Sequence, residues 1–363
     1  MATDKIRIGI THGDINSISY EIILNTLLDG RILEDCIPVF YGSAKVAAYY
    51  RKALNMGNIT FNTVRGADEA RINKINLVNF PNEEVRVELG KSTTHAGEAA
   101  FWALDMAVKD LKAGKLDAIV TAPINKQNIQ SDQFRFNGHT EFFQSQFGSK
   151  EVLMFMVNNL MRVGVVTGHV PLQKVSSLIT EELILSKLKL MNQSLLSDFC
   201  IRKPKIAVLG LNPHAGDEGL LGEEEKNIIA PAIEKARNLG IMAIGPFPAD
   251  GFFGSGAFSK YDAILAMYHD QGLIPFKGIT NQEGVNYTAG LPIVRTSPAH
   301  GTAYELAGKG TASDESFRAA FYLANDIFKN RKQYKELTAN PLRHYDKPTS
   351  TRDESIDITR MDD

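Results

Sequence analysis

Short apolar, β-branched runs alternate along this chain with longer stretches of helical period, and few folds accommodate such an alternation. It is typical of an α/β fold with a largely parallel sheet. Most of the short runs lead directly into a loop rich in Gly, Pro, His or Asn, and such loops lie where open α/β sheets bind ligands. We predict strands at Ile6–Ile10, Pro38–Tyr41, Ala118–Ala122, Val152–Val157, Arg162–Thr167, Ile206–Leu211 and Ala263–Met267.

Three stretches between or after these strands predict helices. Thr94–Leu111 places its apolar residues close to one helical stripe and is followed by Gly114, a residue that favours a helix end. Thr180 precedes two glutamates and opens a second helix. A third helix begins with acidic residues at Asp314 and Glu315, with Ser313 as its candidate N-cap.

Charge and cysteine content exclude several classes of partner. Forty Lys and Arg against forty-two Asp and Glu leave a net charge of -2, so no global field attracts nucleic acid or an acidic membrane. Two cysteines without CxxC spacing favour a reducing compartment. The start of the chain lacks the apolar segment of a secretory signal, and no apolar run approaches the roughly 18 residues of a membrane span. We therefore expect a cytoplasmic protein.

Common nucleotide and metal motifs are absent. The segment after Ile10 reads THGDINSIS and lacks the GxGxxG of an ordinary dinucleotide site. GSGAFS at Gly254–Ser259 lacks the third glycine and is interpreted as a flexible turn. GKST at Gly90–Thr93 lacks the earlier glycine of a P-loop, because Val85 occupies that position. Without an HExxH motif, any metal site must draw its ligands from distant segments.

Three histidines share one setting. His169 in TGHVPL, His214 in NPHAG and His269 in MYHDQG each follow a predicted strand by a few residues. If their loops converge, three neutral imidazoles with an open fourth position would suit a catalytic divalent metal, with Asp250 and Asp270 as nearby carboxylates. On spacing alone, the competing interpretation is three unrelated loop histidines bonded to backbone carbonyls. Three other histidines are interpreted as non-ligands, namely His12 in a turn, His95 at a helix start and His344 in the tail.

Two further groups could bind an anion. His139 and Thr140 in GHTE open an apolar helical stretch and offer side-chain donors and helix amides, although Thr140 could simply be an N-cap. Lys277, Asn286 and Arg295 each lie between apolar residues. They could bind carboxylate or phosphate and orient hydroxyls, or they could form a solvated charged face.

Six motifs in order give these candidates a context, and the resemblance that they carry runs over about residues 6–327. GHTEFF, TGHVPL, GLNPHAG, AMYHDQG, GVNYTAGLPIVRTS and HGTAYELAGKG closely resemble the 4-hydroxythreonine-4-phosphate dehydrogenase family of the vitamin B6 pathway. The resemblance implies that His169, His214 and His269 bind the metal. It also implies substrate contacts from the following residues: His139, Thr140, Lys277, Asn286 and Arg295.

A wider resemblance is to the isocitrate and isopropylmalate dehydrogenases. It implies a two-domain α/β fold with a mostly parallel sheet and an interdomain cleft. The first domain would comprise residues 1–128 and 288–345 and the second residues 129–287, followed by a polar tail over 346–363. The resemblance to the 4-hydroxythreonine-4-phosphate dehydrogenase family further implies a homodimer, in which one subunit's metal ligands complete the other's active site at the interface.

The same resemblance implies a cofactor loop that differs from GxGxxG. It would consist of His300, Gly301, Thr302 and Ala303, followed by AGKG. Glu305 falls where the superfamily places an acidic residue on the ribose hydroxyls, which would favour NAD.

The implied activity is oxidation of 4-phosphohydroxy-L-threonine followed by decarboxylation to 3-amino-2-oxopropyl phosphate, with one divalent metal. We expect zinc first, with magnesium or cobalt as alternatives. The residue that removes the hydroxyl proton stays open among Asp250, Asp270 and Lys277. Two rival functions are a metal-dependent phosphatase or hydrolase and a non-catalytic phosphometabolite-binding protein.

The first loop departs from the family pattern. The family usually reads GDPAGIGPE there, whereas DINSISYE at Asp14–Glu21 replaces the proline and the glycines. If this loop shapes the pocket, the substrate could instead be a related phosphorylated four-carbon hydroxy acid.

Overall fold

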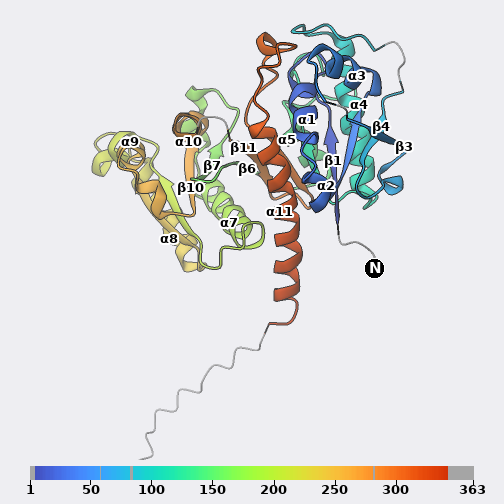
Figure 1. Cartoon of the computed structure of the whole chain (residues 1–363). Coiled ribbons are helices and arrows are strands. Elements are labelled where there is room, and N and C mark those ends of the chain that lie inside the picture. The colour runs from blue at the N-terminus through green and yellow to red at the C-terminus, as the bar shows by residue number, and fades with distance from the viewer. Residues whose placement is uncertain (1–4, 58, 82–84, 281–282, 342–363) are drawn as a thin grey trace, which may run out of the picture.

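The computed structural model of the chain describes residues 5–57, 59–81, 85–280 and 283–341 (Figure 1). His344 and the predicted polar tail therefore lie outside the described residues. In the described part, no helix is long and apolar enough to cross a membrane.

A twelve-stranded sheet in the order β3-β4-β2-β1-β5-β12-β11-β6-β7-β10-β8-β9 forms the centre of the protein. Its pairings are parallel except between β12 and β11, β11 and β6, and β6 and β7. The strands are β1 (Ile6–Thr11), β2 (Cys36–Gly42), β3 (Phe61–Val64), β4 (Ile75–Asn79), β5 (Ala118–Thr121), β6 (Leu153–Val157), β7 (Arg162–Thr167), β8 (Lys205–Leu209), β9 (Met242–Phe247), β10 (Ala263–Tyr268), β11 (Val285–Ala289) and β12 (Val294–Pro298).

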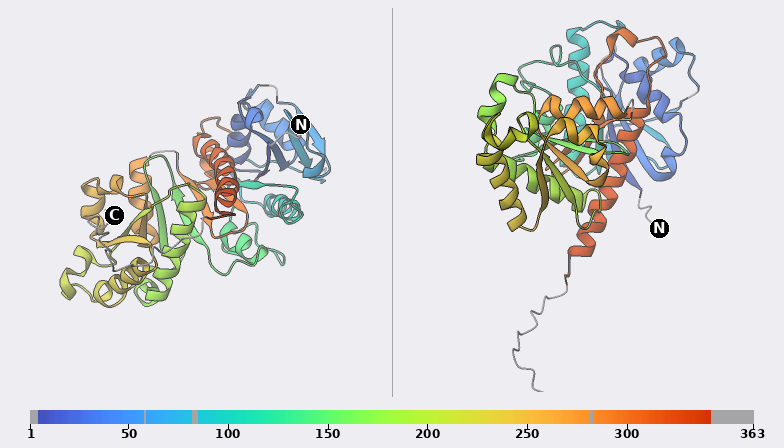
Figure 2. Two further views of the ribbon diagram at one scale, coloured as in Figure 1. Left: turned by 90° about the horizontal axis from the view of Figure 1, so that it is seen from below. Right: turned by 90° about the vertical axis from the view of Figure 1, so that its left-hand side faces the viewer.

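Helices flank this sheet on both sides (Figure 2). They are α1 (Ser19–Leu27), α2 (Ile32–Asp35), α3 (Ala44–Ala53), α4 (Thr94–Lys112), α5 (His139–Gln146), α6 (Val175–Leu178), α7 (Glu181–Ser197), α8 (Ala230–Asn238), α9 (Ala249–Gly254), α10 (His269–Thr280) and α11 (Glu315–Thr338). The predicted α/β class with a mostly parallel sheet is confirmed, as are all seven predicted strands. The remaining five strands were not predicted.

The three predicted helices are present, with one change of cap. Thr93 and Thr180 cap α4 and α7, because their side chains accept hydrogen bonds from the backbone N–H groups of Ala96 and Leu183. The N-cap of α11 is Asp314, so the prediction of Ser313 was one residue early. The Oγ of Ser313 nevertheless accepts a bond from the Glu315 N–H at 3.3 Å.

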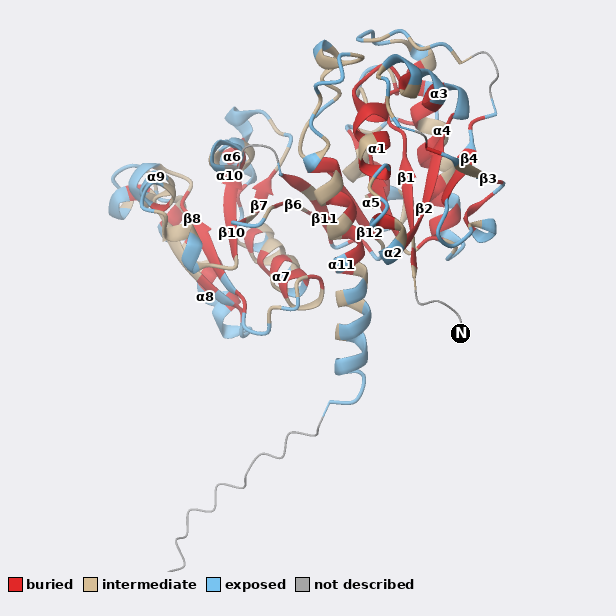
Figure 3. Ribbon diagram, viewed as in Figure 1, coloured by how far each residue is buried: buried red, intermediate tan, exposed pale blue. Residues whose placement is uncertain are grey.

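Two lobes share the sheet. Strands β1–β5 with α1, α3 and α4 form one lobe, and β6–β10 with α7–α10 form the other (Figure 1). Buried strands run through both lobes, as the red ribbons of Figure 3 show. Helix α11 packs on β12, β11 and β5 and also contacts α7, so it joins the lobes. The sheet is continuous through both lobes and marks no boundary between them. The predicted domain limits therefore stay a prediction.

Candidate active site

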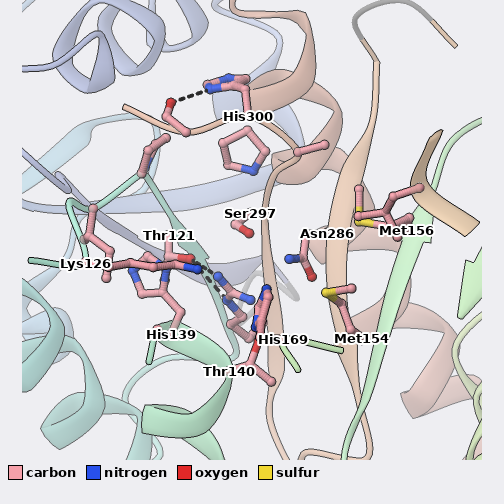
Figure 4. A pocket seen from close by; sticks show the side chains of 18 of the residues that line it. Thr121, Lys126, His139, Thr140, Met154, Met156, His169, Asn286, Ser297 and His300 are labelled. Carbon is pink, nitrogen blue, oxygen red and sulfur yellow. Dashed lines mark hydrogen bonds between the residues drawn. The ribbon is translucent and has the colours of Figure 1, made fainter. Parts of the chain in front are cut away.

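A pocket of about 290 Å³ lies between the two lobes. Figure 4 shows His139, Thr140, His169 and Asn286 around the same space. Among the predicted site residues, those that line the pocket are His139, Thr140, His169, His269, Lys277, Asn286, Arg295, His300 and Gly301. Sequence reasoning missed further polar lining residues, namely Thr121, Lys126, Glu141 and Ser297.

Arg295 on β12 is the most unusual residue of this pocket. Its side chain is only 2% exposed, and its guanidinium donates to hydroxyl oxygens alone: Nη2 to Thr121 Oγ1 at 2.8 Å and Nη1 to Thr288 Oγ1 at 3.1 Å. No described carboxylate forms an ion pair with it. Burial lowers the pKa of Arg295 to about 9, and the charge of Glu141 opposes this shift. A buried cation without a counter-ion is costly, so the site is suited to an anionic ligand.

His139 begins helix α5 beside this guanidinium. Its Nε2 is buried and has no hydrogen-bond partner among the described residues. Burial, reinforced by the charges of Arg295 and Lys126, holds the pKa of His139 well below its usual value. The imidazole is therefore neutral. Gly138 occupies the N-cap position and Thr140 lies inside the helix, so the interpretation of Thr140 as an N-cap was wrong.

His169 and His269 meet at the mouth of the pocket. They follow the adjacent parallel strands β7 and β10, and their ring centroids lie 5.7 Å apart. Each Nδ1 faces a carboxylate: His269 Nδ1 lies 2.7 Å from Asp270 Oδ1, and His169 Nδ1 lies 3.7 Å from Glu141 Oε1. Interaction with His169 is the main cause of a lowered pKa of Glu141.

His214 does not join this pair within the chain. It follows β8, the next parallel strand after β10, but it is exposed and does not line the pocket. In the described ranges, no three His, Cys, Asp or Glu side chains lie close enough together to hold a metal. The two paired imidazoles nevertheless fit part of a divalent-metal site, because carboxylates on Nδ1 leave each Nε2 free as a ligand.

The three proton-acceptor candidates are placed differently. Lys277 of α10 lines the pocket, whereas Asp270 faces the His269 ring. Asp250 lies in the first turn of α9, is exposed and does not line the pocket. Within one chain, only Lys277 has access to a ligand bound there.

A second pocket, of about 550 Å³, adjoins the first one. Lys277, Ala299, His300 and Gly301 line both, so the two spaces share a wall. His300 bonds through Nδ1 to the Gly301 carbonyl at 3.0 Å, while its buried Nε2 has no partner in the described structure. Burial lowers the pKa of His300.

The predicted cofactor loop contributes only in part to this second pocket. Ala303 lines it together with His300 and Gly301. Thr302 and Glu305 do not line it, and Glu305 is exposed. The Thr302 carbonyl instead accepts a hydrogen bond from the Ile18 N–H.

The unusual first loop is buried and hydrogen-bonded to other segments of the chain. Asn16 donates to the Lys91 carbonyl and Thr93 Oγ1 and accepts from the Glu88 N–H. Tyr304 donates to Asp14 Oδ2 at 2.7 Å, which connects the loop to the segment that follows the predicted cofactor loop. The polar residues that replace the usual proline and glycines therefore all lie in a packed environment.

Comparison with known proteins decides the family. The profile described as "Pyridoxal phosphate biosynthetic protein PdxA" matches residues 34–324. The chain belongs to the PdxA family. It is 53% identical over 350 residues to a 4-hydroxythreonine-4-phosphate dehydrogenase of Bacteroides thetaiotaomicron, covering 96% of each chain. The family resemblance inferred from the motifs is thus confirmed, and this PdxA-family chain is a dehydrogenase.

Other PdxA relatives show the range of the similarity. A crystal structure of 4-hydroxythreonine-4-phosphate dehydrogenase from Klebsiella pneumoniae has a TM-score of 0.78 at 31% identity, covering 90% of this chain and 99% of that one. A Clostridium botulinum relative, provisionally named D-threonate 4-phosphate dehydrogenase, is 36% identical over 327 residues, 89% of this chain and 97% of its own.

Proposed function

We propose that this chain catalyses the NAD-dependent and divalent-metal-dependent oxidation of 4-phosphohydroxy-L-threonine, followed by decarboxylation to 3-amino-2-oxopropyl phosphate. The observation that carries the proposal is the buried Arg295 guanidinium, which has only hydroxyl partners in the described structure. A phosphorylated amino acid supplies the anionic groups that such a site requires.

The other lining residues suit the same substrate. Lys126 adds positive charge for phosphate and carboxylate. The neutral His139 offers Nε2, and the buried, unpartnered Oδ1 of Asn286 can accept a bond from a substrate hydroxyl. Interactions with these remote groups position the reacting carbon and so contribute to the rate.

His169 and His269 would hold the divalent metal through Nε2. When bound, the metal lowers the pKa of the reacting hydroxyl and stabilises negative charge on its oxygen. Lys277 faces the same space and can accept the hydroxyl proton in its neutral form. The β-keto acid product of such an oxidation readily loses carbon dioxide.

The second pocket suits NAD because it meets the first at Lys277 and His300. A nicotinamide ring at this junction would lie next to the reacting carbon and accept the hydride. The ribose contact of Glu305 is not part of this argument, since that residue is outside the pocket.

A homodimer would bring His214 of a second copy to the metal. Exposed apolar side chains gather on the segments that follow β7, β8 and β10, next to the three histidines. They are Leu172, Leu178, Leu220, Leu221 and Ile274. Exposed apolar groups of this kind mark interfaces, and a two-fold axis places the same surface on both partners.

The test is NADH absorbance on mixing the protein with NAD, a divalent metal and 4-phosphohydroxy-L-threonine. We expect NADH formation that a chelator abolishes. Release of phosphate without NADH would favour the hydrolase, and thermal stabilisation by the substrate without NADH would favour a binding protein. Either result would overturn the proposal.

A further inference from the structure

Glu141 is a pocket carboxylate with no role in the proposed function so far. It lies on α5 in the same turn as His139 and Thr140. Its Oε1 faces His169 Nδ1 at 3.7 Å, whereas its Oε2 is buried without a hydrogen-bond partner in the described residues. The following residues, Phe142 and Phe143, are buried in one cluster with Leu104 of α4. This packing fixes the helix that carries the carboxylate.

The neighbouring imidazole shows the same arrangement in a closer form. His269 Nδ1 lies 2.7 Å from the carboxylate of Asp270. A carboxylate that accepts the Nδ1–H fixes the imidazole tautomer and leaves the lone pair on Nε2 for a metal. Two imidazoles with ring centroids 5.7 Å apart thus each have a carboxylate next to Nδ1.

We propose that Glu141 is a positioning residue that accepts the Nδ1–H of His169 and so orients its Nε2 toward the divalent metal. This inference rests on the proposed function. Because Glu141 and His139 belong to one helix turn while His169 follows β7, the contact joins the substrate-binding helix to the metal-binding strand. At 3.7 Å the two atoms lie beyond hydrogen-bond distance, so we expect the contact to shorten below about 3.2 Å when metal is bound.

A competing role for Glu141 is electrostatic. Its charge raises the pKa of Arg295 against the effect of burial, so it could act only as a partial counter-charge for that guanidinium. The two roles differ in what they predict. Positioning depends on the acceptor oxygen, so it predicts a larger loss of metal affinity with leucine than with glutamine, whereas a purely electrostatic role predicts equal effects of the two variants.

The experiment measures the dissociation constant of Co²⁺ by titration calorimetry, and its visible absorption, for the wild type, Glu141→Gln and Glu141→Leu. We expect a loss of about 10–100-fold in metal affinity with leucine, the range for outer ligands of this kind. Glutamine should lose less, because its amide oxygen still accepts a hydrogen bond. The cobalt spectrum should change with leucine, since the imidazole is no longer held.

The chain offers a matched control in Glu98, whose Oε2 lies 3.5 Å from Nδ1 of His95, outside the pocket. Glu98→Leu should leave cobalt affinity unchanged. Wild-type cobalt affinity in both Glu141 variants, with altered binding of inorganic phosphate, would overturn the positioning role in favour of the counter-charge. If the Glu141→Leu variant does not fold, the cobalt affinity of Glu141→Gln is compared with that of the wild type instead. If the wild type forms NADH with metal and both Glu141 variants bind cobalt with wild-type affinity, this inference is refuted. The proposed function would then stay intact.

Discussion

Four of the buried polar atoms that have no partner in the described structure belong to residues of one pocket. His139 Nε2, Glu141 Oε2, Asn286 Oδ1 and His300 Nε2 are all buried and unbonded in the described structure, and all four residues line the space next to Arg295. Such atoms are rare in folded proteins because each costs about 1–3 kcal/mol. A ligand bound in this pocket would supply the partners that these four atoms lack.

Arg295→Met tests the most costly of these groups. Methionine fills a similar volume without a charge, so we expect the free energy of unfolding of the ligand-free protein to stay the same or rise. Substrate binding should weaken about 100-fold, since charge-assisted hydrogen bonds contribute roughly 1.5–3 kcal/mol each. Urea denaturation and KM measure the two effects. Unchanged KM would remove Arg295 from the substrate site.

His12 makes stability depend on pH. It is fully buried, its Nε2 lies 2.9 Å from the Ala99 carbonyl, and burial lowers its pKa from 6.5 to about 4. The unfolded chain therefore binds more protons between these values, so the free energy of unfolding should fall as the pH drops from 6.5 to 4. The loss should reach roughly 3 kcal/mol at about 1.36 kcal/mol per pKa unit. Urea titrations of His12→Asn should show a flatter dependence. An equally steep one would contradict the assignment to His12.

At the scale of elements, the sequence allowed prediction of seven strands in which apolar residues predominate. The strands that carry the site were missed: β11 reads VNYTA and β12 reads VRTSP. Their polar residues break the apolar pattern because Asn286, Arg295 and Ser297 line the pocket. Asn286 and Arg295 were therefore identified as polar residues between apolar neighbours and by motif resemblance, whereas Ser297 was missed.

The first loop, at Asp14–Glu21, should contribute to the stability of the fold through Asn16. Asn16 is fully buried, and Asn16→Ala removes three hydrogen bonds to the segment that precedes α4. We expect a loss of about 2–4 kcal/mol in the free energy of unfolding. Asn227→Ala, which removes one exposed bond to Glu223, should change it by less than about 0.5 kcal/mol in the same urea experiment. Equal effects would show that the loop is not a structural connection.

On the scale of the whole molecule, convergence depends on strand order. Strand β10 lies between β7 and β8 although it follows both in the sequence, and this order brings His269 next to His169. No sequence pattern within one segment indicates that a later strand is inserted between two earlier ones. Glu141 was missed for a similar reason, because its partner His169 lies on the other lobe. His214 can join His169 and His269 only if a second copy of the chain supplies it.

Mixing two inactive variants tests the shared site. His169→Ala and His214→Ala should each lower turnover by orders of magnitude as pure proteins. If His214 comes from the second copy, each mixed dimer regains one intact site, so an equimolar refolded mixture should recover about a quarter of wild-type activity. No recovery, with mixed dimers confirmed by mass spectrometry, would place all three ligands in one chain or remove His214 from the site.

The central claim is that the pocket between the lobes oxidises a phosphorylated substrate held by Arg295. The most direct measurement compares initial rates of NADH formation with 4-phosphohydroxy-L-threonine, the same compound without phosphate, and D-threonate 4-phosphate. We predict the highest kcat/KM for the first and a loss of at least about 100-fold without the phosphate. Equal rates with and without the phosphate would contradict the account, and a higher kcat/KM with D-threonate 4-phosphate would replace its substrate.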